Sequence, residues 1–324
     1  MVMGPRTVLI TGAAGFMGRA LCTRYRAEGW NVLGVDRQSD AGAQIAGGDI
    51  STRGPWQDRF DGVDLVVHTA ALVSNTTPRD EAWQVNVAGT RNVVEAAAAA
   101  RVQRLVHVSS VAVYSHDRPD HVDEQWPVRP GGDVYGDTKI GAEQVVWQAH
   151  AAGEVSATVV RPGDVYGPGS RPWTIIPIQM LAAGRVVLPA NGRGTFNAIY
   201  IDDLIDALVI AADHDAAVGQ VFNLTGGHPC ETREFFAYYC HMLGIRPPRV
   251  APTAVAVAVA AAVGTASRAV GRPSEANAAT MRMLSAAGDV SIEKARRLLG
   301  WEPGVDLDEG MRRTEAWLRA EGHL

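Results

Sequence analysis

Residues 7–18 read TVLITGAAGFMG, and this stretch decides the fold. Its first part, 7–10, is a short apolar run typical of a buried strand, and the pattern from 16 to 28 is helical. The same alternation continues through the first half of the chain. Further strands are expected at 30–35, 65–68, 104–108 and 157–160, and further helices at 83–100 and 135–151. Strands buried on both faces and joined by helices predict an α/β fold with a doubly wound parallel sheet.

The three glycines of the opening stretch have separate physical tasks. Gly12 permits the tight turn after the strand, Gly15 lets the backbone approach a pyrophosphate, and Gly18 lets helix and strand pack closely. The helix opens with Phe16 and Met17, and its N-terminus directs free N–H groups and a positive dipole end at phosphate oxygens. Strand, glycine turn and helix together predict a Rossmann fold whose dinucleotide lies against these five residues.

The composition of the sequence changes after Arg161, because residues 162–177 are rich in proline and glycine. Further on, 199–201 reads as a strand that returns to the sheet, 203–212 as a helix, and 221–224 as another short strand. From Thr232 onward the pattern is mostly helical.

These boundaries predict two domains. Residues 1–170, with a return segment at about 199–224, are expected to form the NAD-binding Rossmann domain. Residues 171–198 and 225–324 are expected to form a smaller, mostly helical substrate-binding domain.

Composition excludes several classes of protein. Hydrophobic residues make up 47% of the 324 residues and charged residues 20%, as in ordinary globular proteins. The net charge is −5 and no basic face is visible, so nucleic acid is not an expected partner. The cysteines form no CxxC pair and stand apart from any histidine cluster, so no metal is expected; they are Cys22, Cys230 and Cys240. No signal-peptide pattern stands at the N-terminus, which favours a cytoplasmic protein.

One uncharged stretch rich in alanine and valine, 254–263, needs separate treatment. It is too short for a membrane span, so stable membrane insertion is not expected. We predict a buried or pocket-lining helix, with contact to a membrane surface as the alternative.

An acidic residue ends the second expected strand. Asp36 lies about 20 residues past the glycines, where a carboxylate accepts hydrogen bonds from the adenosine ribose and repels a 2′-phosphate. This favours NAD over NADP, although the adjacent Arg37 is able to accommodate a 2′-phosphate. Asp49 and Ile50 lie where a loop can reach the adenine, and a solvated loop acid is the alternative for Asp49.

Tyr135 and Lys139 are four residues apart on an expected helix and therefore share one face. A free tyrosine has a pKa of about 10, and a nearby ammonium stabilises its phenolate. Tyr-x-x-x-Lys is a weak signal alone, but Ser109 and Ser110 follow an expected strand at the edge where Rossmann ligands bind. Ser110 can hydrogen-bond a substrate oxygen beside the tyrosine. We predict Ser110, Tyr135 and Lys139 as the catalytic residues.

The motifs along most of the chain follow one order. They are TGAAGFMG at 11–18, Asp36, Asp49-Ile50, HTAA at 68–71, NVAGT at 86–90, VSSVAVY at 108–114, YGDTK at 135–139, RPGDVYGPG at 161–169 and YIDD at 200–203. In this order they resemble the extended short-chain dehydrogenase/reductase family, which includes NAD-dependent epimerases and dehydratases.

The resemblance implies further roles. Residues implied to lie near the cofactor are Thr69, Ala70, Ala71, Asn86, Val108, Ser109, Tyr135, Lys139, Pro162, Gly163 and Val165. It also implies a C-terminal substrate domain and a homodimer formed through the helices at 83–100 and 135–151.

Two departures bear on the substrate. Phe196 stands where nucleotide-sugar enzymes of the family usually carry an arginine that holds the diphosphate, and Asp164 stands where they tend to carry asparagine. A desolvated carboxylate facing a diphosphate repels it by on the order of several kcal/mol. Asn197 before Tyr-Ile-Asp-Asp resembles the 3β-hydroxysteroid dehydrogenase-like branch.

The expected function is therefore NAD-dependent hydride transfer between an alcohol and a ketone on an apolar, steroid-like or natural-product-like small molecule. A nucleotide-sugar epimerase or dehydratase with transient NAD reduction is the alternative. A non-catalytic dinucleotide sensor is a third reading, against which the intact Ser110, Tyr135 and Lys139 argue.

Overall fold

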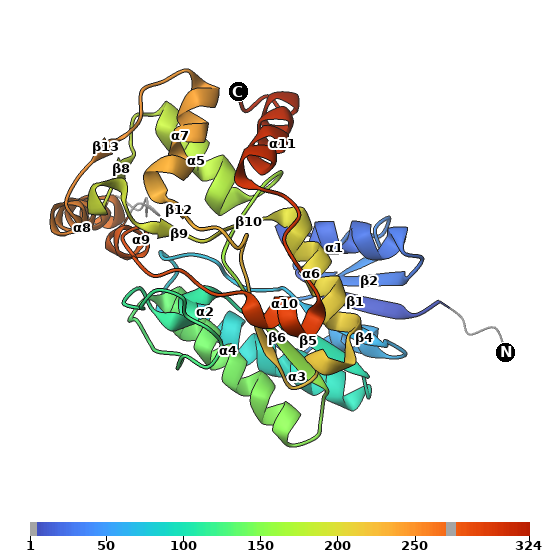
Figure 1. Cartoon of the computed structure of the whole chain (residues 1–324). Coiled ribbons are helices and arrows are strands. Elements are labelled where there is room, and N and C mark those ends of the chain that lie inside the picture. The colour runs from blue at the N-terminus through green and yellow to red at the C-terminus, as the bar shows by residue number, and fades with distance from the viewer. Residues whose placement is uncertain (1–4, 270–276) are drawn as a thin grey trace.

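The computed structural model describes residues 5–269 and 277–324, and its core is a seven-stranded parallel sheet of order β11-β6-β5-β4-β1-β2-β3 (Figure 1). The strands of this sheet are β1 (Thr7–Thr11), β2 (Asn31–Asp36), β3 (Ile45–Gly47), β4 (Leu65–His68), β5 (Arg104–Val108), β6 (Ala157–Pro162) and β11 (Val221–Leu224). The predicted α/β class and parallel sheet are confirmed.

Helices cover both faces of the sheet. They are α1 (Phe16–Ala27) and α6 (Ile201–Asp213) on one face, and α3 (Gly89–Ala99) and α4 (Val134–Ala151) on the other. Alternate strand residues serve the two faces, because successive side chains of a strand point in opposite directions. Val8 belongs to one apolar cluster with Leu204 of α6, whereas Leu9 belongs to another with Val93 of α3 and Val146 of α4.

The helix expected at 83–100 is interrupted in the structure. It is built from α2 (Arg79–Trp83), a π-helical turn η2 (Gln84–Ala88) and α3. The π turn buries Asn86, whose amide hydrogen-bonds Leu72 and Thr138. Single π turns inside helices are frequent at functional sites.

The expected return of 199–201 to the central sheet is wrong. β10 (Ala198–Tyr200) pairs with β7 (Asp164–Tyr166) in a separate two-stranded sheet. Gly163 makes this possible, because a Cβ there would lie 2.1 Å from the carbonyl oxygen of Asn197. The chain therefore leaves the main sheet at Gly163 and passes Asn197 at a distance that only glycine permits. β11 does pair with β6.

The remaining elements lie mostly beyond the carboxyl edge of the sheet, the edge at which its strands end (Figure 1). Short turns are η1 (Pro55–Phe60), η3 (Val111–Tyr114), η4 (Arg171–Ile175), η5 (Ala190–Gly192) and η6 (Asp215–Ala217). Helices are α5 (Ile176–Ala182), α7 (Thr232–Leu243), α8 (Thr253–Ala269), α9 (Ala278–Met283), α10 (Glu293–Leu299) and α11 (Leu307–Ala320). The strand pairs are β9 (Thr195–Phe196) with β12 (Cys230–Glu231), and β8 (Val187–Leu188) with β13 (Arg249–Val250).

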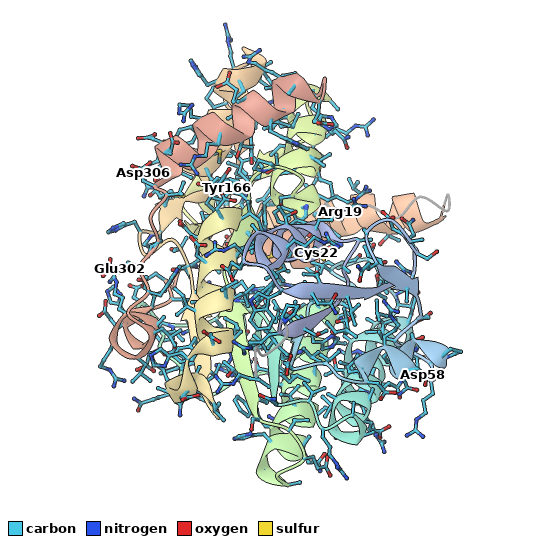
Figure 2. All side chains as sticks on the ribbon, turned by 90° about the vertical axis from the view of Figure 1, so that its right-hand side faces the viewer. Arg19, Cys22, Asp58, Tyr166, Glu302 and Asp306 are labelled. Carbon is cyan, nitrogen blue, oxygen red and sulfur yellow. The ribbon has the colours of Figure 1, made fainter. Side chains whose placement is uncertain are left out.

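The C-terminal helices α10 and α11 pack against strands from earlier in the chain. α10 packs against β11, and α11 packs against β10. Tyr166 of β7 lies beneath α11 in Figure 2, and a Cβ added to Gly310 of α11 would lie 2.0 Å from its hydroxyl oxygen. The C-terminal helix is thereby fixed on β7, next to the residues that follow β6.

The stretch 254–263 forms part of α8, and the prediction of a buried helix is wrong for one of its two faces. Ala256 and Ala260 are buried, whereas Val255, Val259 and Val263 are half exposed. Because the stretch is apolar on all sides, its sequence pattern does not indicate which face of the helix packs against the rest of the protein. Within residues 5–269 and 277–324, no helix combines the length and hydropathy that a membrane crossing requires.

A buried polar network joins α4 to the sheet. Glu143 of α4 and Arg161 of β6 are linked by two hydrogen bonds of 2.8 and 2.6 Å, with side chains only 2% and 5% exposed. Ser109 donates to Glu143 at 2.5 Å, Arg161 donates to Tyr114 at 2.7 Å, and Tyr114 donates to Asn223 at 2.8 Å. The two buried charges of this network, Glu143 and Arg161, are therefore paired with each other.

We predict that Glu143→Gln destabilises the protein by about 3 kcal/mol, because the Arg161 guanidinium keeps its charge in a buried place without a counter-ion. Urea denaturation measures the change. Glu315→Gln, which breaks the exposed Arg319–Glu315 pair, is the matched control and should cost less than about 1 kcal/mol. Equal effects of the two variants would contradict the assigned role of the network.

Candidate active site

Nearly all residues predicted to bind a cofactor lie at the carboxyl edge of the sheet. They follow or end β1 (Gly12, Gly15, Phe16, Met17, Gly18), β2 (Asp36, Arg37), β3 (Asp49, Ile50), β4 (Thr69, Ala70, Ala71), β5 (Val108, Ser109) and β6 (Pro162, Gly163, Val165). Asn86, Tyr135 and Lys139 lie on helices. Segments up to 150 residues apart in the sequence therefore meet where ligands of such sheets bind.

The glycine turn is packed so tightly that side chains are excluded. Gly12 has φ +72°, and a Cβ there would lie 2.9 Å from the backbone of Ala70. A Cβ on Gly18 would lie 2.0 Å from the carbonyl oxygen of Gly12. Gly15 caps α1 without any side-chain hydrogen bond, so the first N–H groups of the helix are free to bind an anion.

Asp36 holds the turn in place. Its Oδ2 accepts a hydrogen bond from the Ala14 N–H at 3.0 Å, and its Oδ1 makes only a long contact of 3.4 Å with the Gln38 N–H. One carboxylate oxygen therefore braces the glycine turn while the other keeps capacity to accept from a ribose hydroxyl. The neighbouring Arg37 is exposed.

Three predicted residues already have partners within the chain. Asp49 accepts from the Ser51 N–H at 2.9 Å, and hydrogen bonding from the Ser51 side chain and then from its N–H lowers the pKa of the Asp49 carboxyl. Ile50 is buried against Gly89 of α3. Both N–H groups of the Asn86 amide donate, one to the Leu72 carbonyl and one to the Thr138 hydroxyl, so Asn86 ties the loop after β4 to α4.

The three predicted catalytic residues come together where β5 ends and α4 begins. The Lys139 ammonium is buried and donates to the Val108 carbonyl at 2.7 Å. The Ser110 side chain lies close enough to the Tyr135 hydroxyl to lower the pKa of that phenol, and its Oγ accepts from the Ala112 N–H at 3.2 Å. Asp133 caps α4 by accepting from the Gly136 N–H at 2.7 Å, which fixes the first turn that carries Tyr135.

Burial shifts the pKa values of both Tyr135 and Lys139. It raises the pKa of Tyr135 to about 12, and the charges of Asp133 and Asp164 add to that rise while the Ser110 hydrogen bond opposes it. Burial also lowers the pKa of Lys139 to about 8. The charge of Lys139 acts on His68 and His107 rather than on Tyr135, so the expected depression of the tyrosine pKa by this ammonium is absent in the chain by itself.

Asp164, which the sequence singled out, borders this site together with Arg118, which the sequence did not. Burial raises the pKa of Asp164 to about 7, and its Oδ2 accepts from the Asn197 N–H at 3.1 Å. Arg118 is the cation that acts on Asp164, and it donates to the carbonyls of Gly288 and Ser115. Arg118 lies in a loop without a recognisable motif, so no local pattern could have paired it with Asp164.

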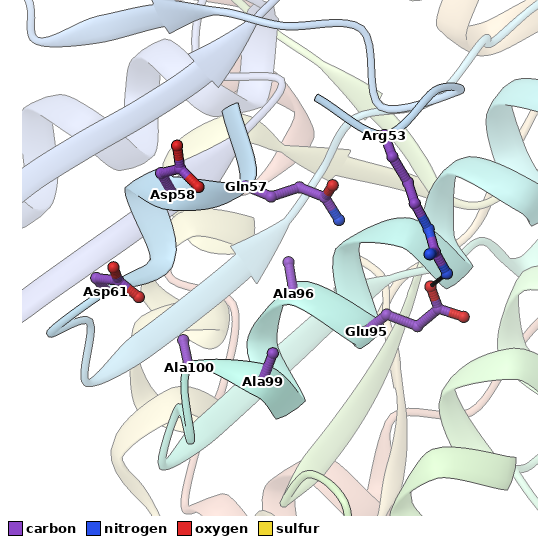
Figure 3. Close-up of a pocket in the computed structure, with 8 residues that line it drawn as sticks. All are labelled: Arg53, Gln57, Asp58, Asp61, Glu95, Ala96, Ala99 and Ala100. Carbon is purple, nitrogen blue, oxygen red and sulfur yellow. Dashed lines mark hydrogen bonds and ion pairs between the residues drawn. The ribbon is translucent and has the colours of Figure 1, made fainter. Parts of the chain in front are cut away.

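The residues present fit a dinucleotide. The glycine turn offers free N–H groups, Asp36 an unfilled acceptor, and Lys139 a buried ammonium with N–H groups beyond the one used by Val108. A separate groove of about 540 Å³ lies between η1 and α3, lined by residues such as Arg53 and Glu95 (Figure 3). No predicted site residue lines that groove.

Comparisons with known proteins agree on the family. The model of the NAD dependent epimerase/dehydratase family matches residues 8–225. A 4-hydroxy-2-methyl-3-oxo-4-farnesyl-3,4-dihydroquinoline-1-oxide ketoreductase of Stigmatella aurantiaca is 31% identical over 93% of this chain and 93% of its own length. A 3 beta-hydroxysteroid dehydrogenase/Delta 5→4-isomerase of Mycobacterium tuberculosis is 28% identical over 75% of this chain and 71% of its own.

Solved structures share the fold along the whole chain. The structure of MoeE5 in complex with UDP-glucose and NAD superposes with a TM-score of 0.78 at 27% identity, over 97% of this chain and 99% of the other. The two relatives by sequence are thus named for ketone or steroid substrates, whereas the structural neighbour was solved with a nucleotide sugar.

We predict that Asp36→Ala narrows the preference for NAD over NADP, because the variant loses the charge that repels a 2′-phosphate. The affinities for NAD and NADP, measured by tryptophan fluorescence or calorimetry, give the ratio. Asp61→Ala, at an exposed acid far from the glycine turn, is the control. An unchanged ratio in Asp36→Ala would show that another residue selects the cofactor.

Proposed function

This chain belongs to the NAD-dependent epimerase/dehydratase family, and from this premise we propose that it is an oxidoreductase for an alcohol or ketone on an apolar small molecule. The observation that carries the proposal is the meeting of Ser110, Tyr135 and Lys139 at the carboxyl edge of the sheet, beside a glycine turn that fits the dinucleotide. The enzyme class itself follows from the family. The substrate class is our own inference.

The roles that we assign follow from the geometry. NAD, when bound, supplies the acceptor or donor for a hydride. Tyr135 removes the proton from a substrate hydroxyl in oxidation and returns it in reduction. Ser110 donates a hydrogen bond to the same substrate oxygen and holds it beside the phenol. Lys139 holds the ribose with the N–H groups that Val108 leaves free, and Asn86 positions α4 through Thr138.

Two positions support an apolar substrate over a nucleotide sugar. Phe196 is 2% exposed and packs with its ring centroid 4.1 Å from Phe235 and 4.7 Å from Trp173. A cation for a diphosphate is therefore missing at this position, and an aromatic cluster occupies the space. Asp164 adds a buried carboxyl near Tyr135, and the nearby Arg118 already serves two backbone carbonyls. A desolvated diphosphate next to this carboxyl is disfavoured.

The alternative, a nucleotide-sugar epimerase or dehydratase, has its support in the similarity to MoeE5, which was solved with UDP-glucose. The proposed division into an NAD-binding and a substrate-binding domain serves both functions equally. The homodimer through 83–100 and 135–151 and the cytoplasmic location stay predictions.

The test is a screen of sterols, other apolar hydroxy-ketones and nucleotide sugars, read by NADH absorbance and by product analysis. We expect NAD-dependent oxidation or reduction of an apolar member, and a loss of roughly 100-fold or more in turnover for Tyr135→Phe with NAD affinity unchanged. Conversion of a UDP- or dTDP-sugar without net NADH would establish the alternative. Turnover near the wild-type level in Tyr135→Phe would remove the assigned proton transfer.

We predict that Asp164→Asn shifts the alkaline pH dependence of alcohol oxidation to lower pH. Asp164 is negatively charged above about pH 7, and its charge raises the pKa of Tyr135. Removing that charge lowers the tyrosine pKa, so the phenolate forms at lower pH. The measurement is kcat/KM against pH. Asp137→Asn, on the same helix but without effect on the Tyr135 pKa, should leave the profile in place. A profile unmoved by Asp164→Asn would contradict the coupling.

A further inference from the structure

The helix α8 presents an apolar face that the protein leaves uncovered. Val255, Val259 and Val263 follow one another at intervals of four residues and are 52%, 57% and 50% exposed. This spacing places them along one side of the helix. Exposed alanines extend the face; they are Ala254, Ala258, Ala261 and Ala262. The opposite side packs on the protein through Ala256, Ala260 and Gly264.

The strand pair that precedes α8 adds two exposed valines, one on each of its faces. Val187 of β8 is 40% exposed and Val250 of β13 is 50% exposed, and the register pairs them with Arg249 and Leu188 respectively. β13 is joined to α8 through Ala251, whose N–H donates to the Leu188 carbonyl. We call the α8 face formed by Val255, Val259 and Val263 the valine surface. Figure 1 places β8, β13 and α8 together at one end of the molecule. Contiguous exposed apolar area of this kind marks an interaction site.

The segments that carry these elements contain basic residues and no acidic ones. Residues 171–201 and 235–265 contain no aspartate or glutamate, although the whole chain has a net charge of −5. Four arginines of these segments are exposed: Arg185, Arg193, Arg246 and Arg249. None of their guanidinium groups forms an ion pair with a residue that the structure describes. They are free to meet anions outside the chain.

We propose that the valine surface docks on the surface of an anionic lipid bilayer, with the valines in the interfacial layer and the four arginines at the lipid phosphates. An apolar helix face supplies the hydrophobic contribution to such binding, and each nearby cation adds an electrostatic one. A second copy of this chain is a poorer occupant, because a two-fold contact would bring the same arginines face to face. This docking does not depend on which substrate the enzyme uses.

The docking surface is also connected to the active site. α8 packs against α9, and Thr280 of α9 accepts a hydrogen bond from the Asn75 amide. The Asn277 side chain donates to the Asn75 carbonyl at 3.3 Å. Asn75 lies in the loop that follows β4 and carries Thr69, Ala70 and Ala71. A bilayer-bound enzyme therefore holds its substrate region next to the lipid, where apolar molecules concentrate.

Flotation with lipid vesicles tests the proposal on the full chain, without substrate. We expect binding to vesicles of phosphatidylcholine with 30% phosphatidylglycerol, and weaker binding to phosphatidylcholine alone or at high salt. The double variant Val255→Asp/Val259→Asp should lose roughly 10-fold or more in binding, because it places carboxylates in the contact. Arg246→Gln/Arg249→Gln should lose a similar factor on the anionic vesicles only.

The matched control is Ala237→Asp/Ala316→Asp, which adds the same charge at exposed positions of α7 and α11 and should bind like the wild type. Thermal unfolding of every variant checks that the fold is retained, as expected for exposed positions. Absence of wild-type binding to anionic vesicles at low salt would overturn the proposal. So would equal binding by Val255→Asp/Val259→Asp, or gel filtration showing that the valine substitutions split a dimer without any effect on lipid.

Discussion

The register of α4 against the end of β5 is the constraint on which the site depends. Tyr135, Lys139 and Glu143 are spaced by four residues and so face the sheet along one line. Glu143 is fixed by two hydrogen bonds from Arg161, and Lys139 by the Val108 carbonyl. With two points of the helix held by buried groups, the third is not free to slide, and Tyr135 is set beside Ser110. Sliding of the helix is costly, because it would separate the buried charges of Glu143 and Arg161.

The same burial that fixes these groups opposes their chemistry. It makes the phenol of Tyr135 a weaker acid and the ammonium of Lys139 a stronger one, and two carboxylates strengthen the first effect. Both shifts disfavour a phenolate next to an ammonium. The positive charge of an oxidised nicotinamide ring favours the phenolate and opposes the carboxylates. In the mechanism that we propose, proton transfer by Tyr135 therefore depends on occupation of the cofactor site.

Features set by local physics were predictable from the sequence, and features set by distant partners were not. The glycine turn was found because its tasks need glycine at fixed spacing, and the structure shows contacts at Gly12 and Gly18 that exclude a side chain. The pairing of β10 was missed, because a short apolar run does not reveal its neighbour. The choice depended on Gly163, more than 30 residues earlier. The exposed face of α8 was missed for a related reason, since a helix of alanine and valine has no polar side to mark the solvent. The roles of the site residues remain predictions that rest on geometry.

The substrate class depends on single positions rather than on the fold. The TM-score of 0.78 with MoeE5, which was solved with UDP-glucose and NAD, shows a shared fold, and a shared fold does not by itself fix the substrate. Binding a diphosphate requires cations that remain free to meet it. In this chain an aromatic cluster takes the place at Phe196, Arg118 is used by backbone carbonyls, and Asp164 brings a carboxyl close to the reacting oxygen. Each feature alone is compatible with a nucleotide sugar if another cation compensates. Together they leave the position of Phe196 without a cation and place a carboxyl beside the reacting oxygen, and that balance favours a substrate without phosphate.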